Sequence, residues 1–355
     1  MSTIVFLSFQ MPLTAQNLIK NGSFEETSYC PNALSELANT ALGISSPTAG
    51  TTDLFSRCGK GKVAVPKNFK GKQDPQDGDS YAGLYLMAPN DYREYIQFEL
   101  LQTLEKGRYY DFEFYLNLAE TSEVYIQHLQ LLLVGGHVQC ATSKNLSAAR
   151  VSLEGLEKFS FIKLQPRGLL NDRSNWVKVV ATFKAEGFEN RLIIGNFSSN
   201  KGTKFYHLMG EVPRHKQFAY YYVDHAQLYG SDQQDFKLDR PYVLEGVNFA
   251  LDDHRLDEYS KKQIQKVYAQ LRQLPNIKVT INGHTDDQGS KTHNDFLSSR
   301  RARSVANYLI SLGFPEERII SKGHGDTLPL IEKTSDKARR ANRRVDFVIT
   351  EFVDE

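Results

Sequence analysis

The sequence predicts two domains of different classes, an antiparallel β-sandwich followed by an α/β domain with a mixed sheet backed by helices. With 355 residues the chain is long enough for two domains of ordinary size. Residues 17–230 consist of short aromatic and β-branched runs separated by turn residues, which is typical of antiparallel strands. From residue 242 to 355, strand and helix patterns alternate. The polar stretch 231–241 ends in proline and is expected to be a linker.

Alternation of apolar and polar residues identifies the strands of the first domain. The clearest case is 109–116, where every second residue is apolar and faces one way. The long apolar run 124–134 predicts a single central strand. A more polar insertion at 145–173 is expected to form a loop or a short helix. The other predicted strands span residues 81–86, 92–100, 176–183, 191–197 and 220–229.

The second domain is predicted from a change of period. Apolar residues recur at helical spacing in 257–274 and 294–312, and Gly313 is expected to end the latter helix. The predicted order is strand, helix, strand, helix, strand, short helix, strand. The strands are expected at 243–249, 277–283, 318–322 and 343–352, and the short helix at 335–341.

Composition excludes some classes of function. The chain has 43 basic and 42 acidic residues, so it lacks the strongly basic balance of nucleic-acid-binding proteins. No apolar run is long enough for a transmembrane helix. Residues 1–16 predict an export signal from the apolar run 4–9 and the small Ala15, although no basic residue precedes the run. The alternative interpretation of this segment is an ordinary first strand.

The three cysteines fit an exported protein. Cys30 and Cys58 lie in loop-like contexts of one domain, so we expect them to form a disulfide in an oxidising compartment. Cys140 is expected to be buried and not to act as a nucleophile. The spacing of the three contains no zinc-binding pattern.

The two ends of the first domain carry a resemblance. The opening Asn-Leu-Ile-Lys-Asn-Gly-Ser-Phe-Glu-Glu of 17–26 and the closing Tyr-Val-Asp-His-Ala-Gln-Leu-Tyr of 222–229 resemble the first and last strands of galactose-binding-like, carbohydrate-binding jelly rolls. Such domains are common in secreted Bacteroidota proteins. The resemblance implies that Glu25 and Asp224 hold a structural calcium ion. The alternative is a surface carboxylate and a turn-capping group.

The sequence does not decide whether the ligand of this domain is a glycan or a protein. Tyrosines at strand spacing could form platforms for sugars or belong to the core. The candidates are Tyr85, Tyr92, Tyr95, Tyr109 and the run 220–222.

The second domain contains more specific motifs. They are Gly-His-Thr-Asp at 283–286, Gly289, Asn294-x-x-Leu297-Ser298-x-x-Arg301-Ala302, Gly-His-Gly-Asp at 323–326 and Asn-Arg-Arg-Val at 342–345. Together these motifs resemble those of the OmpA C-terminal-like family, whose members bind peptidoglycan non-covalently. The resemblance covers roughly 243–350, with two departures, Ala-Arg-Arg-Ala at 338–341 and Gly-His-Gly-Asp at 323–326 in place of the commoner Gly-Tyr-Gly-Glu.

The resemblance implies a ligand-binding site. Asp286 and Arg301 match the two residues that clamp the ligand, and Asn294 and Arg343 match supporting contacts. Thr285 and Leu297 lie within the same motifs and are assigned to the site with them.

The chemistry of the clamp suits a zwitterion. The meso-diaminopimelate of a peptidoglycan stem peptide ends in an ammonium and a carboxylate. A carboxylate such as Asp286 suits the ammonium, and a planar guanidinium such as Arg301 suits the carboxylate. The predicted helix start at residue 294 also puts Arg301 near the positive end of the helix dipole. His284 is expected to pack under the site, and Arg344 is expected to pair with Asp346 or Asp326.

Together these features predict a non-enzymatic envelope protein of the periplasm, associated with the outer membrane and held on peptidoglycan. Apart from the possible calcium, no cofactor is expected. The first domain would bind a glycan or an outer-membrane protein, for example of a secretion or gliding apparatus. The alternative is a glycan- or peptidoglycan-active hydrolase, with an acid pair drawn from Asp77, Asp79 and Glu94.

Overall fold

The computed structural model describes residues 16–153, 156–210, 213–231, 233, 235–250, 252–274, 276–332 and 335–352. The chain divides into two compact units after Ser231. The export signal expected at 1–16 lies outside the described residues, apart from Gln16.

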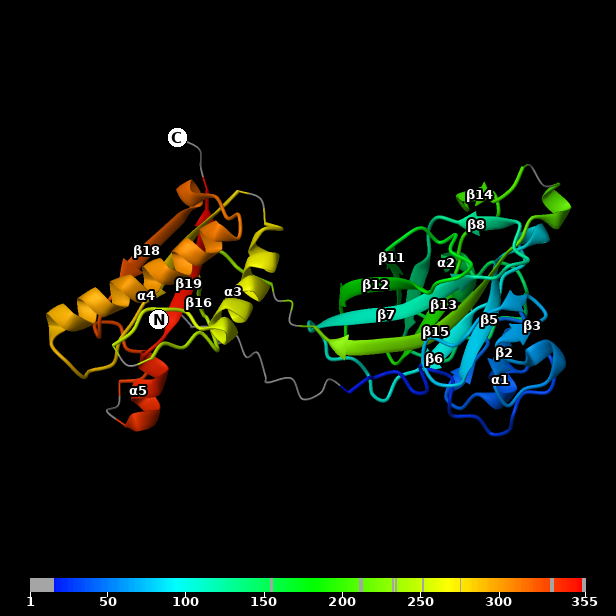
Figure 1. Ribbon diagram of the computed structural model, residues 1–355, viewed down its shortest axis with the longest axis horizontal. Coiled ribbons are helices and arrows are strands. Elements are labelled where there is room, and N and C mark those ends of the chain that lie inside the picture. Colours follow the sequence, from blue (N-terminus) through cyan, green and yellow to red (C-terminus); the bar gives the residue numbers. More distant parts are fainter. Residues whose placement is uncertain are drawn as a thin grey trace. The chain divides into compact units, whose positions relative to one another are not determined.

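The N-terminal unit contains two larger antiparallel sheets. The first has the strand order β11-β12-β7-β15-β5-β2, and its long strands β7 and β15 run side by side (Figure 1). Its strands are β2 (Asp53–Ser56), β5 (Ser80–Met87), β7 (Tyr109–Leu118), β11 (Gln165–Pro166), β12 (Val177–Lys184) and β15 (Ala219–Gly230). The second has the order β1-β6-β13-β9-β10, with β1 (Ile44–Ser45), β6 (Ile96–Glu99), β9 (Gln130–Val134), β10 (Phe159–Lys163) and β13 (Arg191–Gly195).

Short elements complete this unit. Two small ladders pair β3 with β4 and β8 with β14. The elements are α1 (Leu37–Thr40), α2 (Ala148–Leu153), the 3-10 turns η1 (Gly61–Val63), η2 (Pro89–Asp91) and η3 (Arg214–Lys216), and the strands β3 (Lys67–Asn68), β4 (Gly71–Lys72), β8 (Val124–Ile126) and β14 (Phe205–His207).

The two larger sheets share one apolar core. Phe112 and Phe114 of β7 are buried in the same cluster as Phe98 of β6 and Leu133 of β9. Burying one such side chain contributes roughly 1.5–3 kcal/mol. The expectation of antiparallel sheets around a common core is confirmed, whereas the jelly-roll connection order stays a prediction.

The opposite face of the six-stranded sheet is also covered. Phe55, Tyr81, Tyr220 and Tyr222 form a second buried cluster, against which Phe69 packs. Because both faces are buried there, the first half of β15 does not alternate: every residue from Ala219 to Asp224 is buried.

Three predictions for this unit were wrong in detail. The run 124–134 is not one strand: Val124–Ile126 form β8, which pairs with β14, and Gln130–Val134 form β9 of the five-stranded sheet. The stretch 145–173 contains α2 but also β10 and β11. The strand expected at 92–100 is reduced to β6, because the amides of Arg93 and Glu94 bond to Ser143 O and Tyr85 O outside the sheet of β6.

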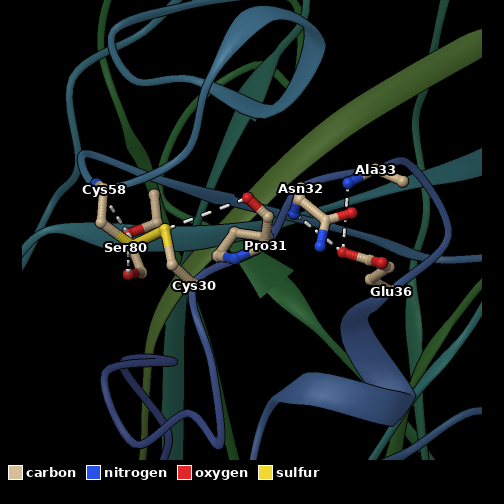
Figure 2. The surroundings of a disulfide bond; sticks show 8 residues. Cys30, Pro31, Asn32, Ala33, Glu36, Cys58 and Ser80 are labelled. Atoms are coloured by element: carbon tan, nitrogen blue, oxygen red, sulfur yellow. Dashed lines mark hydrogen bonds between the residues drawn. A yellow bond between two sulfur atoms is a disulfide. The ribbon is translucent and has the colours of Figure 1, made fainter.

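The expected disulfide is present. Cys30 and Cys58 are bonded, with their Cα atoms 5.9 Å apart (Figure 2). The bond ties the segment before α1 to the residues that follow β2. Next to it, Glu36 accepts the backbone N–H groups of Asn32 and Ala33, which holds the chain leading into α1 (Figure 2). Cys140 is buried and takes no part in a disulfide.

The C-terminal unit is a mixed sheet backed by helices, as expected. The strand order is β16-β19-β17-β18, in which β17 and β18 are parallel and the other neighbours are antiparallel. Among the described residues, no helix is both long and apolar enough to cross a bilayer. The elements are β16 (Pro241–Val243), α3 (Glu258–Leu271), β17 (Ile277–Gly283), α4 (Lys291–Ser311), η4 (Glu316–Arg318), β18 (Ile319–Gly323), α5 (Asp336–Asn342) and β19 (Val345–Glu351).

Several boundaries of this unit differ from the predictions, most of them by one to three residues, and two differences have a clear local cause. The first strand ends at Val243 and does not continue to residue 249, because Gly246 turns the chain with a φ of +74°. Helix α4 begins at Lys291, one turn early, since the Ser290 side chain caps it by accepting the N–H of His293. Phe236, inside the expected linker, packs edge-on against Tyr242 and Phe347, so this part of the stretch joins the core of the C-terminal unit.

Helices α3 and α4 contribute to one core on one face of the sheet. Val267 of α3, Val305 of α4 and Ile281 of β17 belong to the same buried cluster. Glycines end β17 and β18, and both lie against the backbone or side chains of α4. A Cβ at Gly283 would lie 2.1 Å from Ser298 O, and one at Gly323 would lie 2.2 Å from Ser299 Oγ. This close approach puts the first turns of α4 against the carboxyl ends of both strands.

Candidate functional site

The site begins at the turn that follows β17. Thr285 and Asp286 are buried there, and backbone bonds hold the turn on two sides. The N–H of His284 donates to Arg344 O at 2.9 Å, and the N–H of Thr285 donates to Gly325 O at 2.8 Å. The turn is therefore fixed to the beginning of β19 and to the loop after β18.

Three of the predicted site residues meet at the Asp286 side of the turn. Arg343 Nη1 lies 2.5 Å from Asp286 Oδ2, and the N–H of Gln288 donates to Oδ1 at 3.2 Å. Asn294, which is buried on α4, donates to the backbone O of Asp286 at 3.3 Å. The carboxylate is thus held by Arg343, from the segment before β19, and by the backbone of its own turn, while Asn294 of α4 holds the backbone of Asp286.

Arg301 lies farther along α4 and takes other partners. It donates through Nε to Asp253 O at 3.0 Å and through Nη2 to Ala250 O at 3.3 Å, and its guanidinium lies 5.1 Å from the ring centre of Phe249. These bonds use only part of the N–H donors of the guanidinium. No hydrogen bond or ion pair of the described residues joins Arg301 to Asp286 directly.

The charges of the site nevertheless act on Arg301. Burial lowers the pKa of its guanidinium, and the positive charge of Arg343 adds to this effect, while Asp252, Asp286 and Asp253 act in the opposite sense. The prediction that Arg301 lies near a helix start was wrong. Because α4 spans Lys291–Ser311, Arg301 is in mid-helix and does not benefit from the helix dipole.

Helical spacing brings the remaining α4 residues of the site together. Asn294, Leu297 and Arg301 are three to four positions apart and therefore lie on one face of α4. All three are at most 8% exposed. The apolar side chain of Leu297 thus lies between the polar side chains of Asn294 and Arg301 on this face of α4.

A polar network supports the turn from beneath. His284, at 3% exposure, lies 2.9 Å from Asp346 Oδ2, and Arg344 Nε lies 3.2 Å from the same oxygen. Asn282 donates to the other oxygen of Asp346 at 3.0 Å. Burial by itself would raise the pKa of Asp346, but these contacts outweigh burial and lower it. His284 therefore packs under the site as predicted, and Asp346 is the partner of Arg344.

Sequence reasoning missed the segment that holds Arg301. The sequence predicts a strand at Phe249, and no motif points to Ala250 or Asp253. Within this segment, Asp253 binds Arg301 through its backbone O, and its side chain binds Arg255, which lowers the pKa of the Asp253 carboxyl. A second missed contact is the ion pair between Arg339 of α5 and Asp287, at 2.9 Å, on the outer side of the turn.

In the N-terminal unit, Glu25 and Asp224 bind the same loop. Glu25 Oε1 accepts the N–H groups of Asp79 and Ser80 at 2.9 and 2.8 Å. Asp224 Oδ2 accepts those of Gln76 and Asp77 at 2.8 and 3.0 Å. Burial raises the pKa of Asp224 to about 8, although these bonds oppose the shift.

This arrangement does not fit a calcium site. Backbone N–H groups, which are positively polarised, face the oxygens that a cation would need. Nor does the described part of the chain contain a group of three or more His, Cys, Asp or Glu side chains arranged to hold a metal ion. The geometry agrees with the turn-capping alternative.

Two carboxylates of the hydrolase alternative, Asp77 and Glu94, make hydrogen bonds within the N-terminal unit. Asp77 binds Ser23 Oγ at 2.8 Å and lies 3.1 Å from His225 Nδ1. Glu94 is 1% exposed and accepts from Tyr92 Oη at 2.6 Å; burial raises its pKa to about 8. Of the tyrosines considered as sugar platforms, Tyr95 and 220–222 are buried, and only Tyr85, Tyr92 and Tyr109 are partly exposed.

Comparison with known proteins identifies the C-terminal unit. The OmpA family matches residues 248–343, so the chain carries an OmpA-like domain that includes the Asp286 turn, α4 and Arg343. No family is assigned by this match to the N-terminal unit.

The similarity to individual proteins is limited to the same region. The chain is 37% identical over 86 residues to the peptidoglycan-binding protein ArfA of Mycobacterium tuberculosis, covering 24% of this chain and 26% of that protein. It is 32% identical over 101 residues to outer membrane porin F of Pseudomonas aeruginosa, covering 28% of this chain and 29% of that protein. The chain thus spans less than a third of either relative. Among solved structures, the peptidoglycan-associated lipoprotein of Burkholderia pseudomallei is 25% identical with a TM-score of 0.28, covering 29% of this chain and 88% of that one.

Proposed function

We propose that the protein binds peptidoglycan non-covalently through its OmpA-like domain. The observation that carries this proposal is the buried guanidinium of Arg301, which donates to two backbone carbonyls, has no ion pair among the described residues, and feels the charge of the buried Asp286 carboxylate. A buried charge without an ionic partner is costly, and the carboxylate of a ligand would supply that partner. A relative named as a peptidoglycan-binding protein supports the assignment.

The ligand would be the free zwitterionic end of meso-diaminopimelate in a stem peptide. Its ammonium would approach Asp286, alongside or in place of the guanidinium of Arg343. Its carboxylate would accept N–H donors of Arg301 that the Ala250 and Asp253 carbonyls do not use. Asn294 would keep the Asp286 turn in position, and Leu297 would pack under the ligand.

Thr285 adds a further polar group. Its hydroxyl is buried and, among the described residues, has no hydrogen-bond partner. A buried polar atom of this kind is stabilised when a ligand supplies the bond. The location next to Asp286 makes the Thr285 hydroxyl a contact for the same zwitterion.

The protein would act in the periplasm as a non-enzymatic anchor associated with the outer membrane. Each charge-assisted bond contributes about 1.5–3 kcal/mol, which gives modest affinity for one stem peptide. A polymeric wall offers many such peptides, so modest affinity suffices for retention. The N-terminal unit would then hold a second ligand, a glycan or an outer-membrane protein such as a component of a secretion or gliding apparatus.

Sedimentation with purified sacculi tests the binding site. Asp286→Asn removes the charge with little change of shape, and Arg301→Ala removes the guanidinium. We expect each to weaken retention by about ten- to a hundredfold, the effect of losing one charge-assisted bond. Free meso-diaminopimelate should compete with the wild type. Sacculi that carry lysine in place of diaminopimelate should retain it poorly, because they lack the second carboxylate.

Arg303→Ala is the matched control, since Arg303 is an exposed arginine of the same helix. It should sediment like the wild type, and circular dichroism should show that all variants are folded. Full retention of both Asp286→Asn and Arg301→Ala would refute the site. Equal retention on lysine-containing sacculi would refute the diaminopimelate assignment but not peptidoglycan binding.

A further inference from the structure

The N-terminal unit contains an open cavity of about 980 Å³ that none of the sites above uses. Three segments of the chain line it: the end of β5 with η2, the loop after β13, and η3. Its volume is in the range of pockets that bind small ligands. The cavity is built by the N-terminal unit alone.

One wall of the cavity is braced from inside the protein. The guanidinium of Arg93, which is 0% exposed, donates to Ser198 O at 3.0 Å and to Thr203 Oγ1 at 3.3 Å. Asn196 donates to the same Thr203 hydroxyl at 2.9 Å and to Leu86 O at 2.9 Å. The loop after β13 is therefore preorganised, a property that reduces the entropic cost of binding a ligand.

The facing wall has an unusual backbone. Asn90 and Asp91 both have a φ of +60°, in the left-handed region that L-residues seldom occupy twice in succession. Asn200 holds this turn: its N–H donates to Asp91 Oδ1 at 2.5 Å, and its Nδ2 donates to Ala88 O at 2.9 Å. Strained turns that are fixed in this way occur preferentially at ligand sites.

The same asparagine also provides an unused acceptor. Asn200 Oδ1 is buried and has no hydrogen-bond partner among the described residues, although both donors of the residue are engaged. A ligand hydroxyl would satisfy it. Because Asn200 lines the cavity, a rigidly held acceptor on this residue is suited to a hydroxyl group of a sugar.

The charges of the lining favour an acidic ligand. Lys201 and Arg214 are exposed and line the cavity together with His215, and among the lining residues that the structure describes Asp91 is the only carboxylate. No ion pair to Lys201 or Arg214 is present within the described ranges. Phe205 provides an apolar ring for the face of a sugar. Cations next to a hydroxyl acceptor and an aromatic ring fit a sugar that carries a carboxylate or sulfate.

We infer that this cavity binds an anionic saccharide, with Asn200 accepting from a sugar hydroxyl and with Lys201 and Arg214 binding its acidic group. The inference rests on the proposal that the N-terminal unit holds a second ligand and decides for a glycan over a protein. A pocket of this volume with an unsatisfied acceptor inside suits one or two sugar units, whereas a protein partner needs a broad contact surface.

Isothermal titration calorimetry on the full chain tests this inference. The probes are an oligogalacturonate, its fully methyl-esterified form, in which the charge is removed, and a sulfated galacto-oligosaccharide. We expect the acidic probes to bind, the ester to bind at least about tenfold more weakly, and added salt to weaken binding. Comparison of the two acidic probes separates a carboxylate ligand from a sulfate ligand.

The test variant is Lys201→Gln/Arg214→Gln, and the matched control is Lys204→Gln. Lys204 is an exposed lysine of the same loop that does not line the cavity. The double variant should lose affinity at least about tenfold, and the control should bind like the wild type. Unchanged binding by the double variant overturns the site, and equal binding of the ester overturns the charge assignment. If neither acidic probe binds, the saccharide is refuted and a protein partner is favoured.

Sacculus sedimentation of the same variants keeps the two proposals apart. Lys201→Gln/Arg214→Gln should sediment like the wild type, and Arg301→Ala should bind the acidic probes like the wild type. The sedimentation assay can then refute peptidoglycan binding, and the calorimetry can refute saccharide binding, independently of each other.

Discussion

Removing the disulfide is expected to destabilise the N-terminal unit and leave the C-terminal unit unchanged. Both cysteines are exposed, so replacing them by alanine removes little packing. The double variant Cys30→Ala/Cys58→Ala therefore isolates the effect of the cross-link. In the chain-entropy model, that effect is mainly on the unfolded chain, which gains the freedom that the closed loop denied it.

The size of the effect follows from the length of the loop. The bond joins residues 28 positions apart. For a loop of this length the chain-entropy relation predicts a loss of about 3.6 kcal/mol of unfolding free energy. This is a large part of the roughly 5–15 kcal/mol by which domains are usually stable.

Two spectroscopic signals separate the units in one sample. The single tryptophan, Trp176, belongs to the N-terminal unit, where it donates to Asp74 O at 2.9 Å and packs against Tyr81. The long helices α3 and α4 belong to the C-terminal unit. Tryptophan fluorescence and far-ultraviolet circular dichroism during a guanidinium titration therefore report mainly on the N-terminal and C-terminal units, respectively.

We expect the fluorescence midpoint of the double variant to fall and the helical transition to stay where it is. Wild-type protein treated with a reductant should behave like the variant. A fluorescence transition that changes by less than about 0.5 kcal/mol would refute the entropic argument. A parallel fall of both transitions would show that the two units do not unfold independently.

Two further predictions concern packing and pH. Gly283→Ala would place a Cβ 2.1 Å from Ser298 O, so α4 must move away from β17; we expect the helical transition to lose about 1–3 kcal/mol and the Trp176 transition to stay the same. An unchanged helical transition would contradict the close approach. Burial raises the pKa of Glu94 to about 8 from 4.5, so the folded state keeps a proton that the unfolded state releases. The N-terminal unit should therefore lose stability as pH rises from 4.5 towards 8, by at most about 1.4 kcal/mol per pH unit, and level off above that range. Glu94→Gln should lessen this fall, and the same shift at Asp224 should account for part of the remainder; a flat wild-type profile of the Trp176 transition would contradict the burial argument.

Local patterns predicted the elements whose environment is uniform. Strand β17 has the predicted bounds, because Ile277, Val279 and Ile281 face one continuous core. The start of α4 was missed by one turn, although Ser290 is a good helix cap and could have indicated it. The run 124–134 was misjudged because its residues are apolar throughout, and apolarity does not reveal which sheet a strand will join.

The site shows the same division. Motif spacing placed Thr285, Asp286, Asn294, Leu297 and Arg301 on one turn and one helix face, since these residues are close in the chain. The contact between Arg343 and Asp286 joins residues 57 positions apart. The bonds of Arg301 reach back 48 and 51 positions, to Asp253 and Ala250.

The sequence by itself determined the two classes of unit, the disulfide partners and the charged residues of the turn and helix after β17. The tertiary structure alone decided that Arg343 holds Asp286, that Arg301 is bound by the Ala250–Asp253 segment, and that Glu25 and Asp224 serve one loop. The reason is physical: periodicity and capping depend on neighbours a few residues away, whereas these contacts form only when the whole core brings distant segments together.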